Sequence, residues 1–129
     1  MPMDALYRDF ILDHYKNPRN FGTLEPHDLE FHDLNPLCGD ELGVHVVVDE
    51  QGRIADLRFH GQGCAISQAA ASISSEELIG MPVSEVPALD ADWVIEQLGI
   101  DISPTRRKCA LLPLKVMRGA TTGDPSWPE

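Results

Sequence analysis

The chain has 129 residues, of which 21 are acidic and 10 are basic, so its formal net charge is −11 at pH 7. Nucleic-acid binders present positive surfaces to phosphates, so we expect no binding to DNA or RNA. No apolar run reaches the roughly 18 residues that a transmembrane helix needs, and acidic and polar residues interrupt the N-terminal segment, unlike a signal peptide. These features predict a cytoplasmic protein without membrane attachment.

The length predicts a single domain, because one hydrophobic core typically organises about 100 to 200 residues. Hydrophobic residues make up 43% of the chain, which is enough for a core that needs neither a structural metal nor disulfides. We expect one domain over residues 1–129, ordered from about residue 4 to 118, with residues 119–129 as a poorly ordered tail.

The N-terminal part predicts one helix and one weak strand. Apolar residues recur at helical spacing over residues 4–16, and Asn17-Pro18 ends this helix because the residue before proline avoids the α region. Residues 28–35 form the weak strand candidate. The loop between them is rich in residues that favour turns.

Two stronger strands follow. Residues 42–49 are rich in β-branched side chains, and residues 53–60 alternate between apolar and polar side chains, as in a half-buried strand. The turn residues Glu50, Gln51 and Gly52 separate the two segments. The short connection predicts an antiparallel hairpin.

The second half of the chain predicts helices over residues 64–79, 91–98 and 104–118, with a short helical turn over 83–88. Pro113 lies inside the last helix, where it predicts a kink or fraying. The order of elements predicts an α+β fold, with an N-terminal helix, a small three-stranded antiparallel sheet, and C-terminal helices packed on one face.

The three cysteines lie at the starts of separate predicted elements. Cys38 shares a tight turn with Asp40, Cys64 follows two glycines at a helix N-terminus, and Cys109 lies in the second turn of the last helix. Each thiol by itself is also compatible with an ordinary turn or core cysteine. Together, three thiolates and one carboxylate supply the four ligands of a tetrahedral zinc site.

Other polar residues give weaker indications. Arg106, Arg107 and Lys108 form the most basic stretch of the chain, and one of these arginines could pair with Asp40. The histidines are scattered along the sequence, so a structural role is expected for each rather than metal ligation. They are His14, His27, His32, His45 and His60.

Four segments resemble, in order, the segments that define the U-type iron–sulfur cluster assembly proteins, namely IscU, the N-terminal domain of NifU, and SufU. They read LYRDFILDHYKNPRNFG, NPLCGD, GQGCAISQAAAS and RRKCALLP, and the match covers about residues 4–118. The resemblance implies that Cys38, Asp40, Cys64 and Cys109 are metal or cluster ligands. It also implies that Arg106 lies close to the aspartate, as in the SufU branch.

The sequence combines features of two branches of this family. Lys108 stands where IscU-type proteins carry a histidine, which favours SufU, yet the chain lacks the insertion that SufU-type proteins usually carry between Cys64 and Cys109. In the SufU branch, the resemblance implies that zinc is the metal and that Cys38 accepts sulfur. In the IscU branch, it implies that Cys109 is the acceptor.

The resemblance implies a pyridoxal-phosphate cysteine desulfurase, SufS- or IscS-like, as the sulfur donor, and a downstream scaffold or apo iron–sulfur proteins as receivers. Our first hypothesis is a zinc-bound sulfur carrier, similar to a sulfurtransferase but without independent turnover. One alternative is a scaffold that binds iron and on which a [2Fe–2S] cluster is assembled and transferred. Another is a zinc-binding module that regulates a desulfurase.

Overall fold

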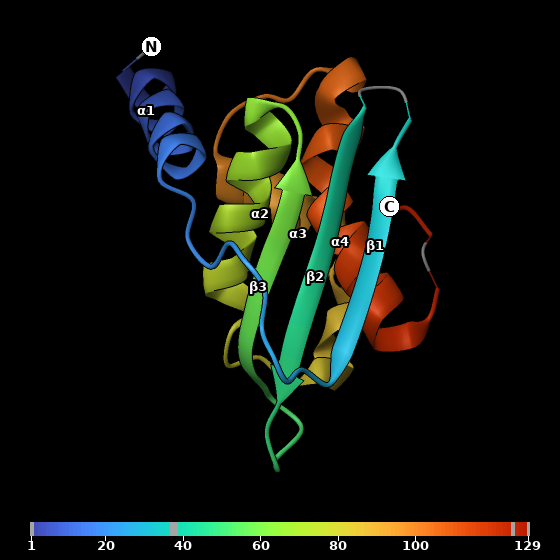
Figure 1. The fold of residues 1–129 in the computed structure, drawn as a ribbon. Helices are drawn as coiled ribbons and strands as arrows, with labels where there is room; N and C mark the ends of the chain where they lie inside the picture. The colour runs from blue at the N-terminus through green and yellow to red at the C-terminus, as the bar shows by residue number, and fades with distance from the viewer. Residues whose placement is uncertain (1, 37–38, 125, 129) are drawn as a thin grey trace.

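The computed structural model describes residues 2–36, 39–124 and 126–128, with side chains from Arg8 onward. It confirms the predicted α+β fold: three antiparallel strands form one sheet, and helices cover one of its faces (Figure 1). The elements are α1 (Pro2–Lys16), β1 (Leu29–Asn35), β2 (Asp40–Val48), β3 (Ile54–Gln62), α2 (Ala65–Leu78), the 3-10 helix η1 (Val83–Ala88), α3 (Ala91–Leu98) and α4 (Pro104–Thr122).

The sheet has the order β1-β2-β3, and its register aligns the ends of the strands. Asn35 at the end of β1 pairs with Asp40 at the start of β2, and Glu41 pairs with Gln62 at the end of β3. At the opposite end, Gly52 has a φ of 79°, which suits glycine in the tight turn of the predicted hairpin. The segments that leave β1, enter β2 and leave β3 therefore lie together at one end of the sheet, opposite to the Gly52 turn.

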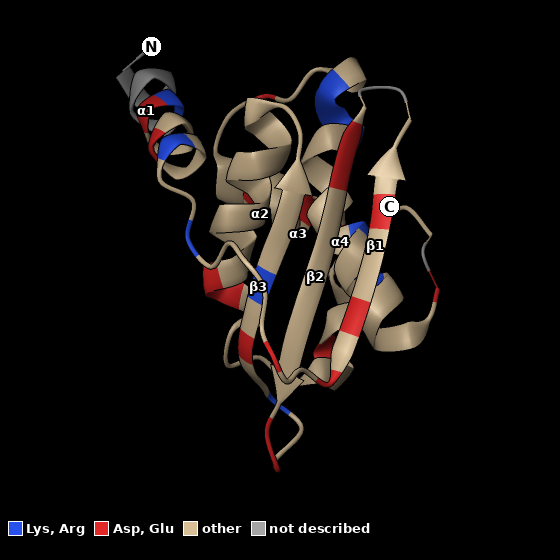
Figure 2. Ribbon diagram, viewed as in Figure 1, with Lys and Arg blue, Asp and Glu red and all other residues tan. Residues whose placement is uncertain are grey.

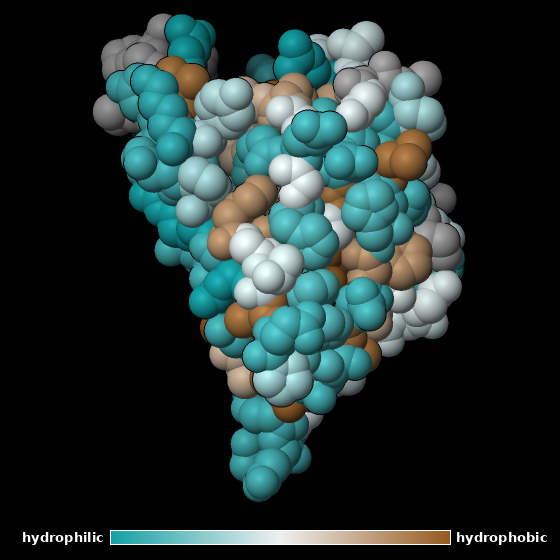
Figure 3. Space-filling view, in the orientation of Figure 1, coloured by the Kyte–Doolittle hydropathy of each residue, from teal (hydrophilic) through white to brown (hydrophobic). Residues whose placement is uncertain are grey.

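The core lies between the sheet and helices α2 and α4. Alternate residues of β2 and β3, such as Val44 and Phe59, are 0% exposed and point to this side. Small side chains of α2, including Ala71, allow the helix to approach the sheet closely. On the opposite, outer face of the sheet the side chains are largely hydrophilic (Figure 3).

The last helix differs from the prediction. α4 passes through Pro113 without interruption and ends at Thr122, beyond the predicted end near Arg118. Pro113 is buried on the packed side of α4, so tertiary contacts hold the helix in spite of the missing N–H. Trp127, in the predicted tail, is half-buried, and the amino groups of Lys108 and Lys115 each lie 5.2 Å from its ring centroid.

Within the described residues, none of the helices combines the length and the apolar character that crossing a bilayer requires.

Candidate metal centre

Asp40, Cys64 and Cys109 come together at the end of the sheet where β2, α2 and α4 begin, at the top of the view in Figure 1. One potential ligand atom from each residue lies within 4.8 Å of the other two. The Asp40 and Cys109 side chains are buried, with exposures of 1% and 0%, and Cys64 is partly exposed. The structure thus brings together three of the four predicted ligands, and Cys38 lies outside the described residues. We refer to Asp40, Cys64 and Cys109 as the candidate metal centre.

The two carboxylate oxygens of Asp40 have different surroundings. Oδ1 accepts a hydrogen bond of 2.9 Å from the backbone N–H of Cys64. Oδ2 is buried and has no hydrogen-bond partner among the described residues. A buried carboxylate oxygen without a partner is unfavourable unless a cation compensates its charge. The site therefore fits a bound metal ion.

Gly63 allows the carboxylate of Asp40 to lie close to the backbone N–H of Cys64. A Cβ at this position would lie 2.7 Å from Oδ1 of Asp40 and 2.4 Å from the hydroxyl oxygen of Ser67. Real Cβ atoms do not approach other atoms so closely, so a larger residue would displace the carboxylate. Cys64 follows directly as the N-cap of α2, at the positive end of the helix dipole. The Gly-Gln-Gly segment before Cys64 was the sequence signal for this contact.

Asn35 is a member of the site that sequence reasoning missed. Its side chain is 0% exposed, and its amide Nδ2 donates a hydrogen bond to Sγ of Cys109 over 3.9 Å. Its backbone carbonyl accepts a 2.9 Å hydrogen bond from the N–H of Gly39. The only sequence signal was its position at the start of the NPLCGD turn.

Arg106 lies in the first turn of α4, in the basic stretch that is blue at the start of this helix in Figure 2. Its side chain is exposed, and no ion pair in the described part of the chain joins it to the buried Asp40. Its pairing with Asp40 stays a prediction.

A second group of potential ligands, Glu25, His27 and His45, also lies within 4.8 Å, and we call it the histidine group. The rings of His27 and His45 are stacked, with centroids 3.8 Å apart and planes inclined by 14°. Imidazole binds metals through lone pairs in the plane of the ring, so two nearly parallel rings cannot point at one ion. As it stands, this arrangement is structural, in line with the expectation for the histidines.

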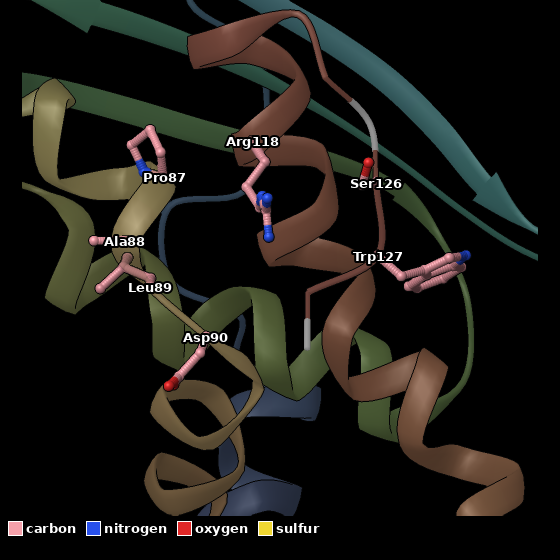
Figure 4. Close-up of a pocket in the computed structure, with 7 residues that line it drawn as sticks. All are labelled: Pro87, Ala88, Leu89, Asp90, Arg118, Ser126 and Trp127. Carbon is pink, nitrogen blue, oxygen red and sulfur yellow. The ribbon is translucent and has the colours of Figure 1, made fainter.

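The described residues also line a cavity of about 410 Å³ between Arg118 on α4, the connection from η1 to α3, and the C-terminal segment at Trp127 (Figure 4). None of the three described ligands, Asp40, Cys64 and Cys109, lines this cavity. Its lining includes the carboxylate of Asp90, which accepts a hydrogen bond from the N–H of Trp93 and so caps α3. The cavity is therefore separate from the candidate metal centre.

The donor set of the candidate metal centre suits zinc or iron, because two thiolates and one carboxylate bind either ion. The geometry, and the oxygen of Asp40 that no described residue hydrogen-bonds, fit either ion and do not distinguish zinc from iron.

Comparisons with known proteins agree over nearly the whole chain. The chain is 35% identical to the zinc-dependent sulfurtransferase SufU of Bacillus subtilis (strain 168), with 89% of this chain and 88% of that protein covered. It is 31% identical to the iron–sulfur cluster assembly scaffold protein IscU of Azotobacter vinelandii, with 88% and 90% covered.

A crystal structure from Fervidobacterium islandicum AW-1, named as a candidate scaffold protein of the SUF system, matches with a TM-score of 0.76 and 29% identity, over 92% of this chain and 98% of that one. Residues 6–123 match the model of the NifU-like N-terminal domain. This chain therefore belongs to the NifU-like N-terminal domain family.

Proposed function

We propose that this protein acts in iron–sulfur cluster assembly as a sulfur carrier, which accepts persulfide sulfur from a cysteine desulfurase at a metal-bound thiolate site and passes it on. This proposal rests on the convergence of Asp40, Cys64 and Cys109 around a buried carboxylate oxygen that has no hydrogen-bond partner among the described residues. The similarity to a zinc-dependent sulfurtransferase supports zinc as the metal.

Asp40, Cys64 and Cys109 would hold the ion, with Cys38 as the fourth ligand. A bound zinc ion keeps coordinating thiols deprotonated, because metal ligation requires the thiolate. Asp40 contributes the one hard oxygen donor, and its position is fixed by the hydrogen bond from the N–H of Cys64. We expect the fold to form without the ion, because Asp40, Cys64 and Cys109 are not members of the two apolar clusters of the core.

The reaction is a thiol–disulfide exchange. The thiolate of Cys38 attacks the terminal sulfur of the desulfurase persulfide, and a new S–S bond forms on Cys38. The S–S bond on the desulfurase breaks, and its electron pair leaves with the desulfurase cysteine as a thiolate. The exchange therefore needs no external oxidant or reductant.

The partner in this proposal is a pyridoxal-phosphate cysteine desulfurase, and the receivers are a downstream scaffold or apo iron–sulfur proteins. We place this protein and these partners in the cytoplasm. The acidic chain, with a net charge of −11, is unsuited to a nucleic-acid partner.

The test is mass spectrometry of this protein after incubation with a desulfurase and cysteine. We expect Cys38 to gain the mass of one sulfur atom, and Cys38→Ala to abolish sulfur acceptance. Stimulation of the desulfurase without sulfur on any cysteine of this chain would instead support the regulatory zinc module. Full sulfur acceptance by Cys38→Ala would overturn the assignment of Cys38.

A second candidate function is a scaffold on which a [2Fe–2S] cluster is assembled and then transferred. The similarity to a protein named as an IscU scaffold and the tolerance of thiolates and carboxylate for iron favour it. Anaerobic reconstitution separates the two functions. A stable chromophore with equal iron and sulfide supports the scaffold, whereas tight zinc binding with rapid persulfide uptake supports the carrier.

A further inference from the structure

Asn35 joins the separate parts of the candidate metal centre. It ends β1, pairs in register with Asp40, and accepts the N–H of Gly39 with its carbonyl at 2.9 Å. Its side-chain amide reaches across to α4 and donates to Sγ of Cys109. One buried residue thus contacts both the turn before Asp40 and the sulfur of Cys109.

The two described sulfurs have different hydrogen-bond environments. Sγ of Cys109 is fully buried and faces an N–H donor that can do nothing but donate. Cys64 is partly exposed, and its Sγ lies 3.9 Å from the hydroxyl of Ser67. That hydroxyl donates its one proton to the carbonyl of Cys64 at 3.1 Å, so it gives the sulfur of Cys64 no hydrogen bond, whether the sulfur is a thiol or a thiolate.

This difference has a chemical consequence. A donor to a thiolate withdraws electron density from sulfur, which makes the thiolate less nucleophilic, and fixes the position of the ligand. A thiolate without a donor, open to solvent, exchanges more readily. The hydrogen bond therefore suits Sγ of Cys109 to stay bound to the metal, whereas Sγ of Cys64 is suited to exchange.

We propose that Asn35 is a positioning residue that makes Cys109 the ligand retained throughout sulfur transfer and leaves exchange to the other thiols. This inference rests on the proposed metal-bound thiolate function. Asn35 acts through Sγ of Cys109 and does not itself contact the proteins that deliver or receive the transferred sulfur.

Cobalt substitution tests the proposal without a desulfurase. The full chain and the variants Asn35→Ala and Asn35→Leu are loaded with Co²⁺, and the thiolate-to-cobalt charge-transfer absorption is recorded. Leu has the same number of side-chain heavy atoms and the same branching as Asn, whereas Ala truncates the side chain, so the pair of variants separates the lost donor from a lost packing contact. The matched control is Ser67→Ala, which changes a group near Cys64 that gives its sulfur no hydrogen bond.

We expect the charge-transfer band to move to lower energy in both Asn35 variants, because a sulfur without its donor is more electron-rich. The band should stay in place in Ser67→Ala. Zinc affinity, from competition with a chromophoric chelator, should fall roughly 10- to 100-fold in the Asn35 variants, the usual effect of losing a hydrogen bond to a metal ligand.

Site-resolved alkylation of the zinc-loaded protein gives a second readout. Iodoacetamide labelling followed by peptide mass spectrometry yields the ratio of Cys109 to Cys64 modification. We expect this ratio to rise in Asn35→Ala and Asn35→Leu. A merely structural loss would loosen the whole site and raise both rates together.

The outcomes separate this inference from the function on which it rests. If the unmodified chain shows no thiolate-to-cobalt absorption and no zinc binding, the proposed function fails. If it binds both metals and the Asn35 variants keep the original band and the original alkylation ratio, the function stands and the role of Asn35 is overturned.

Discussion

Two groups of potential metal ligands each include one residue of β2, and they differ in whether their ligand atoms already have hydrogen-bond partners. In the candidate metal centre, Oδ2 of Asp40 is buried and has no hydrogen-bond partner in the part of the chain that the structure describes. In the histidine group, the backbone of Leu24 forms a hydrogen bond with one nitrogen of each ring. Nδ1 of His27 bonds to the carbonyl of Leu24 at 2.8 Å, and the N–H of Leu24 donates to Nδ1 of His45 at 3.1 Å. Proximity of potential ligands alone does not make a metal site. The feature that distinguishes the candidate metal centre is a buried ligand oxygen that still lacks a partner among the described residues.

The histidine group instead holds the loop between α1 and β1 against the sheet. Besides the contacts to Leu24, the N–H of Gly22 donates to the carbonyl of Phe59 on β3, and that of Asp28 donates to the carbonyl of Val46 on β2. His27 also lies beside Glu25 and Glu30, with N–O distances of 3.3 and 3.5 Å. The rings and these backbone bonds together fasten the loop across the strands.

Exchanging the carboxylate of each group for its amide gives the sharpest contrast. Asp40→Asn keeps the shape and the acceptor for the N–H of Cys64 but removes the negative charge from the candidate metal centre. We expect zinc affinity to fall by more than the roughly 100-fold that loss of a hydrogen bond to a ligand can cause. Equilibrium competition with a chelator measures it.

Glu25→Gln is the matched change in the histidine group, at an exposed carboxylate. It should leave zinc affinity unchanged. Equal losses in the two variants would mean that the histidine group binds the metal after a rotation of its rings, and the comparison would break down.

Gly63→Ala tests whether close packing holds the candidate metal centre together. The new methyl group would lie 2.7 Å from Oδ1 of Asp40, so the carboxylate must move away from the N–H of Cys64. We expect a loss of about 1–3 kcal/mol in the free energy of unfolding, typical of overpacking, together with weaker zinc binding. Urea unfolding of the metal-free protein measures the first, and Gln62→Ala, at an exposed neighbour, is the control.

Much of this architecture could be read from the sequence. The capping residue Asp90 and the stop at Gly99 located α3 at residues 91–98, and the β-branched and alternating segments placed the sheet, because these elements form from local patterns. The positions of Cys64 and Cys109 at helix starts anticipated their approach to Asp40. Local pattern and residue chemistry sufficed for these features.

Features that depend on tertiary contacts were not predictable in the same way. The continuity of α4 through Pro113 comes from burial of its packed side, which propensity does not include. The bond from Asn35 to Cys109 joins β1 to α4, and the stack of His27 on His45 joins a loop to β2. Such pairs are fixed by register and packing and leave no periodic signal.

His45→Ala probes the histidine group alone. The change removes the acceptor for the N–H of Leu24 and the stack on His27. One hydrogen bond and one aromatic pair together contribute about 1–2 kcal/mol, so we expect a loss of that size in the free energy of unfolding. Zinc affinity should stay the same. A loss of metal without a loss of stability would reverse the roles given to the two groups.

The smallest expected effect is the pH dependence of the outer sheet face, where two histidines act with opposite sign. Burial, reinforced by the charge of His45, lowers the pKa of His60. Its contribution to stability is therefore complete above the ordinary histidine value of about 6.5 and is lost as the pH falls through its folded value. The hydrogen bond to the Leu24 carbonyl, with Glu30 and Glu25, raises the pKa of His27. Its contribution is complete below about 6.5 and is lost as the pH rises through its folded value.

Urea midpoints of the zinc-free protein between about pH 8 and about pH 5 cover both titrations. Because the two contributions oppose each other, the unmodified chain should lose little stability from the histidine group and His60 on acidification. His60→Gln should lose less than the unmodified chain, and His27→Gln should lose more, because each variant leaves the other histidine uncompensated. Parallel pH profiles in all three proteins would show that these rings do not change their proton binding on folding, and that stacking and backbone contacts alone hold the loop.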